Sequence, residues 1–241
     1  MSDETIGDRL ARRRLIVVTG KGGVGKTAMA ATLARLLERR GRRVLLLEVD
    51  PRESLFQMLE VAPSGGEIVH VGDDLYLQHL RPRDVLEDIV RDRLPLEILT
   101  RRVLASPVFH HFVEGAPGLE ELAVLGHALR MMTGEFGAPD LQPDVVVLDA
   151  PATGHGVSLL RAPLLVSDVI HHGPLGRLAV RLAEFVADRE QCGIVIVTLA
   201  EEMPVQEALE LKRMLRDDLH RKPELLVVNG LYPEASAEPP A

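Results

Sequence analysis

The chain has 241 residues, which is long enough for one sizeable α/β domain or two small ones with a buried core. A formal net charge of −8 repels phosphate backbones, and an aromatic content of 3% supplies few rings for stacking bases, so general nucleic-acid binding is excluded. The single cysteine, Cys192, excludes an intramolecular disulfide and a paired-cysteine zinc site. No signal peptide and no apolar run near the ~20 residues that span a bilayer are evident. We therefore expect a cytoplasmic protein without stable membrane insertion.

The first part of the chain predicts one βαβ unit. Residues 1–13 are polar and predict a flexible tail. Residues 15–18 form a β-branched apolar run that predicts a strand buried on both faces, and this strand ends at a glycine-rich turn. Apolar residues at helical spacing then follow as far as Gly41, and residues 44–47 predict a second buried strand. A strand, a glycine loop, a helix and a strand over this length are typical of a nucleotide-binding fold.

The middle of the chain departs from this alternation. Residues 75–80 alternate in part and favour a strand. Residues 83–133 are predominantly helical, with breaks at proline residues, and predict a helical insertion on the α/β scaffold. Because this segment is not needed to build a phosphate site, it is the candidate surface for a client or partner. Met131 and Met132 are candidates for that surface, since methionine adapts to varied apolar partners.

The alternation of strands and helices resumes after residue 143. The predicted elements are a strand at 144–148, a helix at 175–189, a strand at 193–198, a helix at 204–219 and a strand at 225–229. Residues 233–241 are rich in Pro, Ala and Glu and predict a disordered tail. The whole pattern predicts an α/β fold with a doubly wound, mostly parallel sheet over residues 14–232.

A complete phosphate-binding motif follows the first predicted strand. It is the segment Gly20-Lys21-Gly22-Gly23-Val24-Gly25-Lys26-Thr27, which satisfies G-x-x-x-x-G-K-[ST]. Its glycines let backbone N–H groups turn inward around phosphate oxygens, and the following helix adds the positive end of its dipole. Lys26 is expected to reach the β- and γ-phosphates, and the Thr27 hydroxyl is expected to coordinate Mg²⁺. The motif predicts a P-loop nucleotide hydrolase that uses ATP and magnesium.

A second lysine, Lys21, lies inside this loop. An ordinary phosphate loop does not need it, because Lys26 already meets the phosphates of its own subunit. Lys21 can instead reach across a two-fold axis to the nucleotide of a neighbouring subunit and act like an arginine finger. It is therefore a candidate catalytic residue of a dimer.

Two acids follow predicted strands, where a magnesium-dependent nucleotide hydrolase needs carboxylates. Asp149 comes directly after the strand at 144–148 and is expected to hold magnesium through water. Asp50 closely follows the strand at 44–47. It is expected to orient or activate the attacking water and to belong to the metal environment.

In these residues and in several further segments, the chain resembles the ArsA/GET ATPases. They belong to the deviant Walker A class, which also includes MinD and ParA. The loop Lys21–Thr27 matches the whole class. The segments that resemble ArsA/GET ATPases in particular are Asp50-Pro51 with Ser54-Leu55, Pro117-Gly118-Leu119-Glu120-Glu121, Asp149-Ala150-Pro151-Ala152-Thr153-Gly154-His155, Glu201-Glu202-Met203-Pro204 and Val228-Asn229. The resemblance covers roughly residues 14–232. It implies an ATP-hydrolysing dimeric switch that couples ATP hydrolysis to a protein client, with Asn229 contacting adenine.

The chain also departs from the family pattern. Ala and Pro are exchanged within the second switch, and the family usually continues past Asn229 with another strand. The chain has no C-x-x-C pair for a zinc-linked dimer and no cysteine cluster for arsenite. Homodimers and heterodimers with a related ATPase both stay open. So do two other functions: a positioning ATPase like ParA or MinD, and a partner subunit that binds nucleotide without hydrolysing it.

Overall fold

The computed structural model describes residues 5–49, 53–63, 65–93, 97–107, 115–134, 141–151 and 158–232. In this part of the chain, a seven-stranded sheet has the order β3-β4-β2-β5-β1-β6-β7. Neighbouring strands are parallel except for β3 and β4, which are antiparallel. The strands are β1 (Leu15–Thr19), β2 (Val44–Glu48), β3 (Ile68–His70), β4 (Leu75–His79), β5 (Val145–Asp149), β6 (Cys192–Leu199) and β7 (Leu225–Asn229). The predicted α/β fold with a mostly parallel sheet is confirmed.

The central strands β1, β2 and β5 are apolar up to their last residue because both faces of the sheet are covered. Successive side chains of a strand point to opposite faces. In β1, Leu15 and Val17 belong to one core cluster, whereas Ile16 and Val18 belong to the other. All five residues of β1 are buried. This is the arrangement that a buried parallel strand requires.

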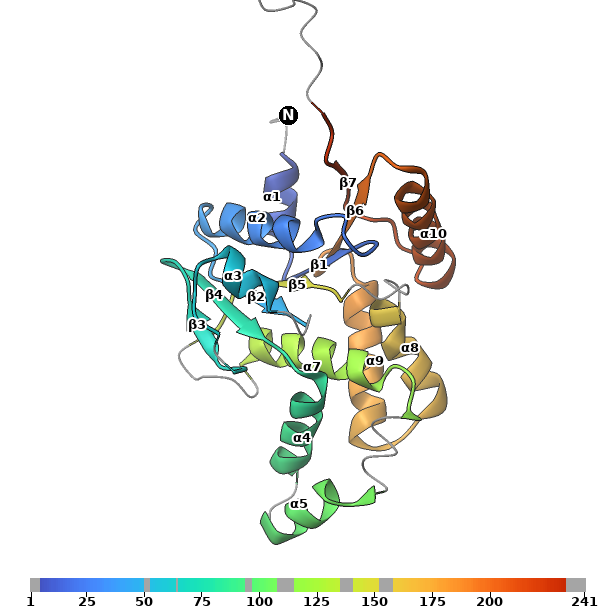
Figure 1. The fold of residues 1–241 in the computed structure, drawn as a ribbon. Helices are drawn as coiled ribbons and strands as arrows, with labels where there is room; N and C mark the ends of the chain where they lie inside the picture. Colours follow the sequence, from blue (N-terminus) through green and yellow to red (C-terminus); the bar gives the residue numbers. More distant parts are fainter. Residues whose placement is uncertain are drawn as a thin grey trace, which may run out of the picture.

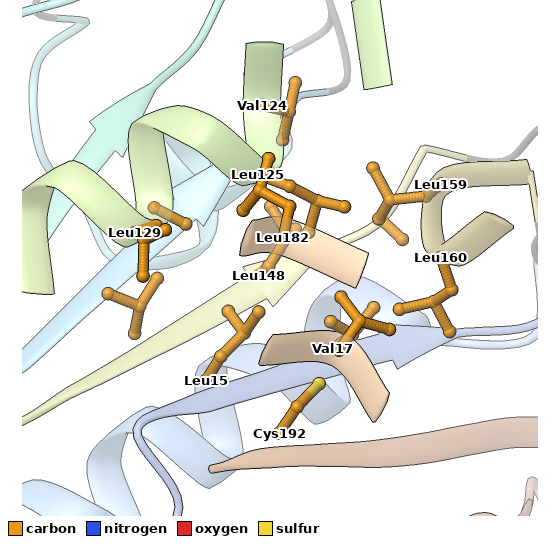
Figure 2. Packing of buried hydrophobic residues seen from close by; sticks show 14 of the residues in the cluster. Leu15, Val17, Val124, Leu125, Leu129, Leu148, Leu159, Leu160, Leu182 and Cys192 are labelled. Atoms are coloured by element: carbon orange, nitrogen blue, oxygen red, sulfur yellow. The ribbon is translucent and has the colours of Figure 1, made fainter. Parts of the chain in front are cut away.

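Helices from different parts of the chain cover the two faces (Figure 1). One face packs against α1 (Ile6–Ala11), α2 (Lys26–Glu38) and α3 (Ser54–Met58). The other packs against α7 (Leu119–Thr133), α8 (Ser158–Val169), α9 (Gly173–Ala187) and α10 (Glu202–Asp218). Figure 2 shows the second core, in which Leu125 of α7 and Leu182 of α9 lie over Leu148 of β5. The doubly wound layering places the carboxyl ends of β1, β2 and β5 at one shared edge.

The segment predicted as a helical insertion is divided between two environments. Helices α4 (Pro82–Arg93) and α5 (Glu97–Leu104) extend away from the sheet in Figure 1, although the first turns of α4 bury Val85 and Leu86 in the core cluster. By contrast, α7 lies in the core, and Met131 and Met132 are each only 2% exposed. These two methionines therefore do not form an exposed client surface in this structure. Their side chains fill the apolar layer beneath the sheet.

The N-terminal segment also differs from its prediction as a flexible tail. Residues 6–11 form α1, which begins with a capping box in which Thr5 and Asp8 exchange hydrogen bonds. The helix buries Leu10 against the α2 side of the sheet. Ile6 and Leu10 lie four positions apart in this short polar stretch, but two residues are too few to establish a helical period, so the sequence pattern did not reveal the helix. The predicted disordered tail, 233–241, lies outside the described residues.

Candidate nucleotide-binding site

The phosphate loop lies between β1 and α2, and its first and last glycines are required by their surroundings. Gly20 has a φ of 145°, and a Cβ there would lie 2.2 Å from the carbonyl oxygen of Val197 on β6. Gly25 has a φ of 92°, and its Cβ would lie 2.3 Å from Nδ2 of Asn229 on β7. Any other residue at either position would collide with these neighbours or strain the backbone. The loop is therefore shaped by two strands that are remote in sequence.

The N-terminus of α2 is suited to an anion. The helix begins at Lys26 after Gly25, which has no side chain to cap it, and its first turn contains no acidic residue. The first backbone N–H groups of a helix have no partner within the helix, and the helix dipole places partial positive charge there. A phosphate group supplies both the acceptor atoms and the negative charge that this end requires.

Two of the three predicted magnesium ligands, Thr27 and Asp149, meet in the structure. The Thr27 hydroxyl donates a hydrogen bond to Oδ2 of Asp149, at 2.7 Å. Asp149 is the last residue of β5, lies beside Val18 of β1 and is 3% exposed. A hydroxyl oxygen and a carboxylate oxygen are hard donors of the kind that Mg²⁺ prefers. The two side chains thus fit a magnesium ion at this place, and Thr27 and Asp149 would hold it.

The two lysines of the loop point to different partners. Lys26 is 6% exposed, and its Nζ donates a hydrogen bond to the backbone oxygen of Lys21 at 2.9 Å, which braces the loop. The Nζ of Lys21 lies 2.8 Å from Oε1 of Glu207 on α10. In this conformation, the side chain of Lys21 is thus held by a neighbouring helix.

Asn229 lies directly behind the phosphate loop. Its Nδ2 donates a hydrogen bond to the backbone oxygen of Val24, at 3.0 Å. One amide therefore ties the end of β7 to the loop. The adenine contact expected of Asn229 stays a prediction.

A buried acid that the sequence analysis did not single out lies at the same edge. Glu48 is the last residue of β2 and is 0% exposed, and it lies in register between His79 of β4 and Asp149 of β5. Its Oε1 accepts a hydrogen bond from the backbone N–H of Leu55, at 3.0 Å. The signal in the sequence that could have identified Glu48 is a charged residue at the end of an apolar strand. The adjacent Asp50-Pro51 and the second-switch residues 152–157 lie outside the described residues.

Comparison with known proteins shows which family of ATPases this chain resembles. The family model of anion-transporting ATPases matches residues 13–173. The ATPase BagA of Mycobacterium tuberculosis is 31% identical over 214 residues, which cover 84% of this chain and 61% of BagA. An arsenical pump-driving ATPase of Escherichia coli is 31% identical over 220 residues, covering 88% of this chain and 34% of that protein. An ASNA1 homologue of Paramecium tetraurelia is 24% identical over 151 residues, covering 61% and 43% of the two chains.

The extent of these matches differs between this chain and its relatives. The chain spans about three fifths of the length of its mycobacterial relatives, since the alignment covers 61% of them. The family model, in contrast, covers more than half of this chain, including the phosphate loop, Asp149 and α7. The chain therefore belongs to the ArsA/GET family of ATPases.

Proposed function

We propose that this chain hydrolyses ATP with magnesium at the edge formed by β1, β2 and β5, and that it works as a dimeric switch. The observation that carries the proposal is the hydrogen bond between Thr27 and Asp149, at 2.7 Å, beside a complete phosphate loop. Through this bond, the hydroxyl of the loop meets the carboxylate at the end of the neighbouring strand. That is the arrangement that P-loop nucleotide hydrolases use around their metal.

Each side chain of the site has a proposed role. The first N–H groups of α2 and the Lys26 ammonium bind the β- and γ-phosphates. Thr27, Asp149 and Asp50 hold magnesium, which supplies charge neutralisation at the phosphates when it is bound. Asp50 orients the attacking water and accepts its proton. Asn229 contacts the adenine from behind the loop.

The proposed dimer gives Lys21 its role. Lys26 already serves the nucleotide of its own subunit, and Lys21 extends toward α10 rather than across its own loop. When two subunits face each other across ATP, each Lys21 neutralises charge that develops on the phosphates of the other. The partner is either a second copy or a related ATPase.

A cavity beside the site offers a route to couple nucleotide state to a protein client. It has a volume of about 460 Å³. Its apolar lining comes from Val49 after β2, Leu80 after β4, Pro82 of α4, Val124 of α7, Pro151 after β5 and Leu159 of α8, and its polar lining from His79, Arg81, Glu120 and Glu121. Two of its lining residues flank the site in sequence, because Val49 precedes Asp50 and Pro151 follows Asp149 by two positions. Helices α4 and α5 extend from this side of the fold, and Ile98 on α5 is 74% exposed. We assign the client surface to the exposed part of residues 83–133.

The test is ATP turnover measured against protein and Mg²⁺ concentrations, with molecular size determined in ADP and in a transition-state analogue. Wild-type protein should show a turnover per subunit that rises with protein concentration. Lys26→Ala should lose ATP binding or turnover, and Asp50→Asn should bind ATP without hydrolysing it. Unchanged affinity and rate in Lys26→Ala would refute the site. ATP binding without any turnover in the wild type would instead identify a non-hydrolysing partner subunit.

A further inference from the structure

Exposed apolar side chains gather on the last strand of the sheet and on the helix before it. The exposed fractions are 38% for Val205 and 43% for Leu209 on α10, and 41% for Leu226 and 40% for Val228 on β7. Scattered apolar residues are common on protein surfaces, whereas contiguous ones mark an interaction site. The question is therefore whether the two pairs of side chains face each other.

The alternation of side chains along β7 places Leu226 and Val228 on the side of the sheet that carries α10. Leu225 and Val227 pack against the core cluster that contains residues of α1 and α2. Successive side chains of a strand point to opposite faces, so Leu226 and Val228 point to the other face. The buried residues of α10 belong to the core cluster on that same face.

The orientation of α10 turns Val205 and Leu209 toward this strand. Glu207 faces the end of β1, because it pairs with Lys21 in the loop that follows β1. Residues two positions away on a helix are rotated by about 200°, so Val205 and Leu209 lie on the opposite flank of α10. α10 packs against β6, and β6 separates β1 from β7, so this flank faces β7 (Figure 1). Together, α10 and β7 thus form one apolar surface, the β7 surface, which consists of Val205, Leu209, Leu226 and Val228.

The backbone of β7 is open to pairing as well. In the part of the chain that the structure describes, β7 is the last strand of the sheet and pairs only with β6. Edge strands usually carry charged residues, prolines or bulges that prevent pairing with another chain. The strand Leu225–Asn229 contains neither a charged residue nor a proline. An unblocked edge beside an apolar surface is suited to the addition of a further strand.

We propose that β7 pairs with β7 of a second copy of this chain, as antiparallel strands that extend the sheet across two subunits. A two-fold pair places the same strand against itself. When the pair is centred on Val227, Leu226 lies opposite the partner's Val228 on each side of the axis, and the uncharged strands bring no like charges together. Centring it on Leu226 or on Val228 would instead place Glu224 or Gly230 opposite an apolar side chain. The sequence of β7 therefore matches itself best about Val227.

The helices complete this interface. The two-fold axis of an antiparallel pair within one sheet is perpendicular to that sheet, so both copies of α10 lie on the same face. Val205 and Leu209 of each copy then face the junction and shield the cross-strand pairs from water. This dimer uses neither the phosphate loop nor a nucleotide, and it is separate from the ATP-dependent dimer proposed above.

The first experiment is sedimentation velocity of the nucleotide-free protein over a range of concentrations. The wild type should approach twice the monomer mass as its concentration rises. Leu226→Lys and Val228→Lys should stay monomeric at the same concentrations, because lysine on an edge strand opposes pairing. The matched control is Val180→Lys, which changes a 47% exposed apolar residue of α9 and should dimerise like the wild type. Slow hydrogen exchange in β1 shows that the lysine variants keep the folded sheet.

The second experiment tests the register by cross-linking. A mixture of Leu226→Cys and Val228→Cys should form disulfide-linked dimers under mild oxidation, several-fold more than either variant alone, because these positions lie opposite each other. The native Cys192 is fully buried and does not compete.

The outcomes that would overturn the proposal are distinct. A monomer at every concentration would show that a second copy does not cover β7. Dimers that persist in both lysine variants, or cross-linking that is equal in the mixture and in the single variants, would place the contact elsewhere. A dimer that forms only with an ATP analogue would belong to the phosphate-loop interface and would leave β7 unpaired.

Discussion

Lys21 and Glu207 form an ion pair in which Nζ and Oε1 are 2.8 Å apart, joining the phosphate loop to α10. Their side chains are 32% and 36% exposed, so the pair is expected to contribute only about 0.2–1 kcal/mol. If Lys21 acts across a dimer, this pair must open first. Glu207→Gln should then raise turnover at limiting protein concentration, by up to about fivefold, the factor for ~1 kcal/mol.

The control for this prediction lies on the same helix. Asp217→Asn removes an exposed acid that pairs with Arg216 at the other end of α10, and it should leave turnover unchanged. Turnover is measured over a range of protein concentrations for both variants. Lower activity in Glu207→Gln would show that the pair supports the site instead of restraining Lys21.

Lys21 itself is tested by complementation. Lys21→Ala should lose on the order of 10³–10⁵ in kcat with little change in ATP affinity, as expected for a cationic finger that acts in trans. Mixing it with Lys26→Ala should restore partial activity. In a mixed dimer, the intact phosphate loop of Lys21→Ala receives Lys21 from its partner. A mixture as inactive as its components, or full activity of Lys21→Ala alone, would dispose of the trans mechanism.

The Thr27–Asp149 pair predicts a specific magnesium dependence. Asp149→Asn should raise the Mg²⁺ concentration needed for half-maximal turnover by at least about tenfold, because it replaces a charged oxygen ligand by an amide. Thr27→Ser keeps the hydroxyl and should retain activity, whereas Thr27→Val should resemble Asp149→Asn. Turnover is titrated with Mg²⁺ at fixed ATP. Equal Mg²⁺ dependence in all four proteins would place the metal elsewhere.

His127 predicts a pH dependence of stability. Burial, with a smaller effect of Arg130, lowers the pKa of His127 to about 4, and its Nε2 lies 2.9 Å from Oε1 of Gln78. The pKa of a histidine in the unfolded chain is about 6.5. Between pH 6.5 and 4, the unfolded chain therefore binds a proton that the folded chain does not. The free energy of unfolding should therefore fall across this window, by about 1–3 kcal/mol from this residue.

Urea unfolding at several pH values tests the histidine prediction. The wild type should lose stability on acidification relative to His127→Gln, which carries no titrating group. His171→Gln, at an exposed position, is the control and should follow the wild type. Parallel curves for wild type and His127→Gln would contradict the prediction.

Cys192 should behave as an inert thiol in the folded chain. It is 0% exposed at the start of β6, and burial raises its pKa to about 11. Because the thiolate is the reactive form, a thiol reagent at pH 8 should label it only as fast as the chain unfolds. Denatured protein supplies the control for full labelling. Rapid stoichiometric labelling under native conditions would show that β6 is accessible.

The central strands and the phosphate loop could be predicted because their signals are local. The apolar run at 15–18, the loop and the following helix are contiguous, and each has a short-range physical cause. The position of Asp149 could be predicted too, since a parallel strand delivers its last residue to a known edge of the sheet. Strand β3 could not be predicted, because its three residues are too few to show an alternation of apolar and polar side chains.

The amino-acid sequence by itself thus determined that the chain has a phosphate loop, two acids after neighbouring strands and a second loop lysine. Tertiary structure decided which groups meet them. Asn229 supports Val24 from 205 residues away, Glu207 holds Lys21 from α10, and Glu48 bonds to the start of α3. These contacts depend on strand order, register and helix packing, which fix side chains in space only once the whole sheet has assembled.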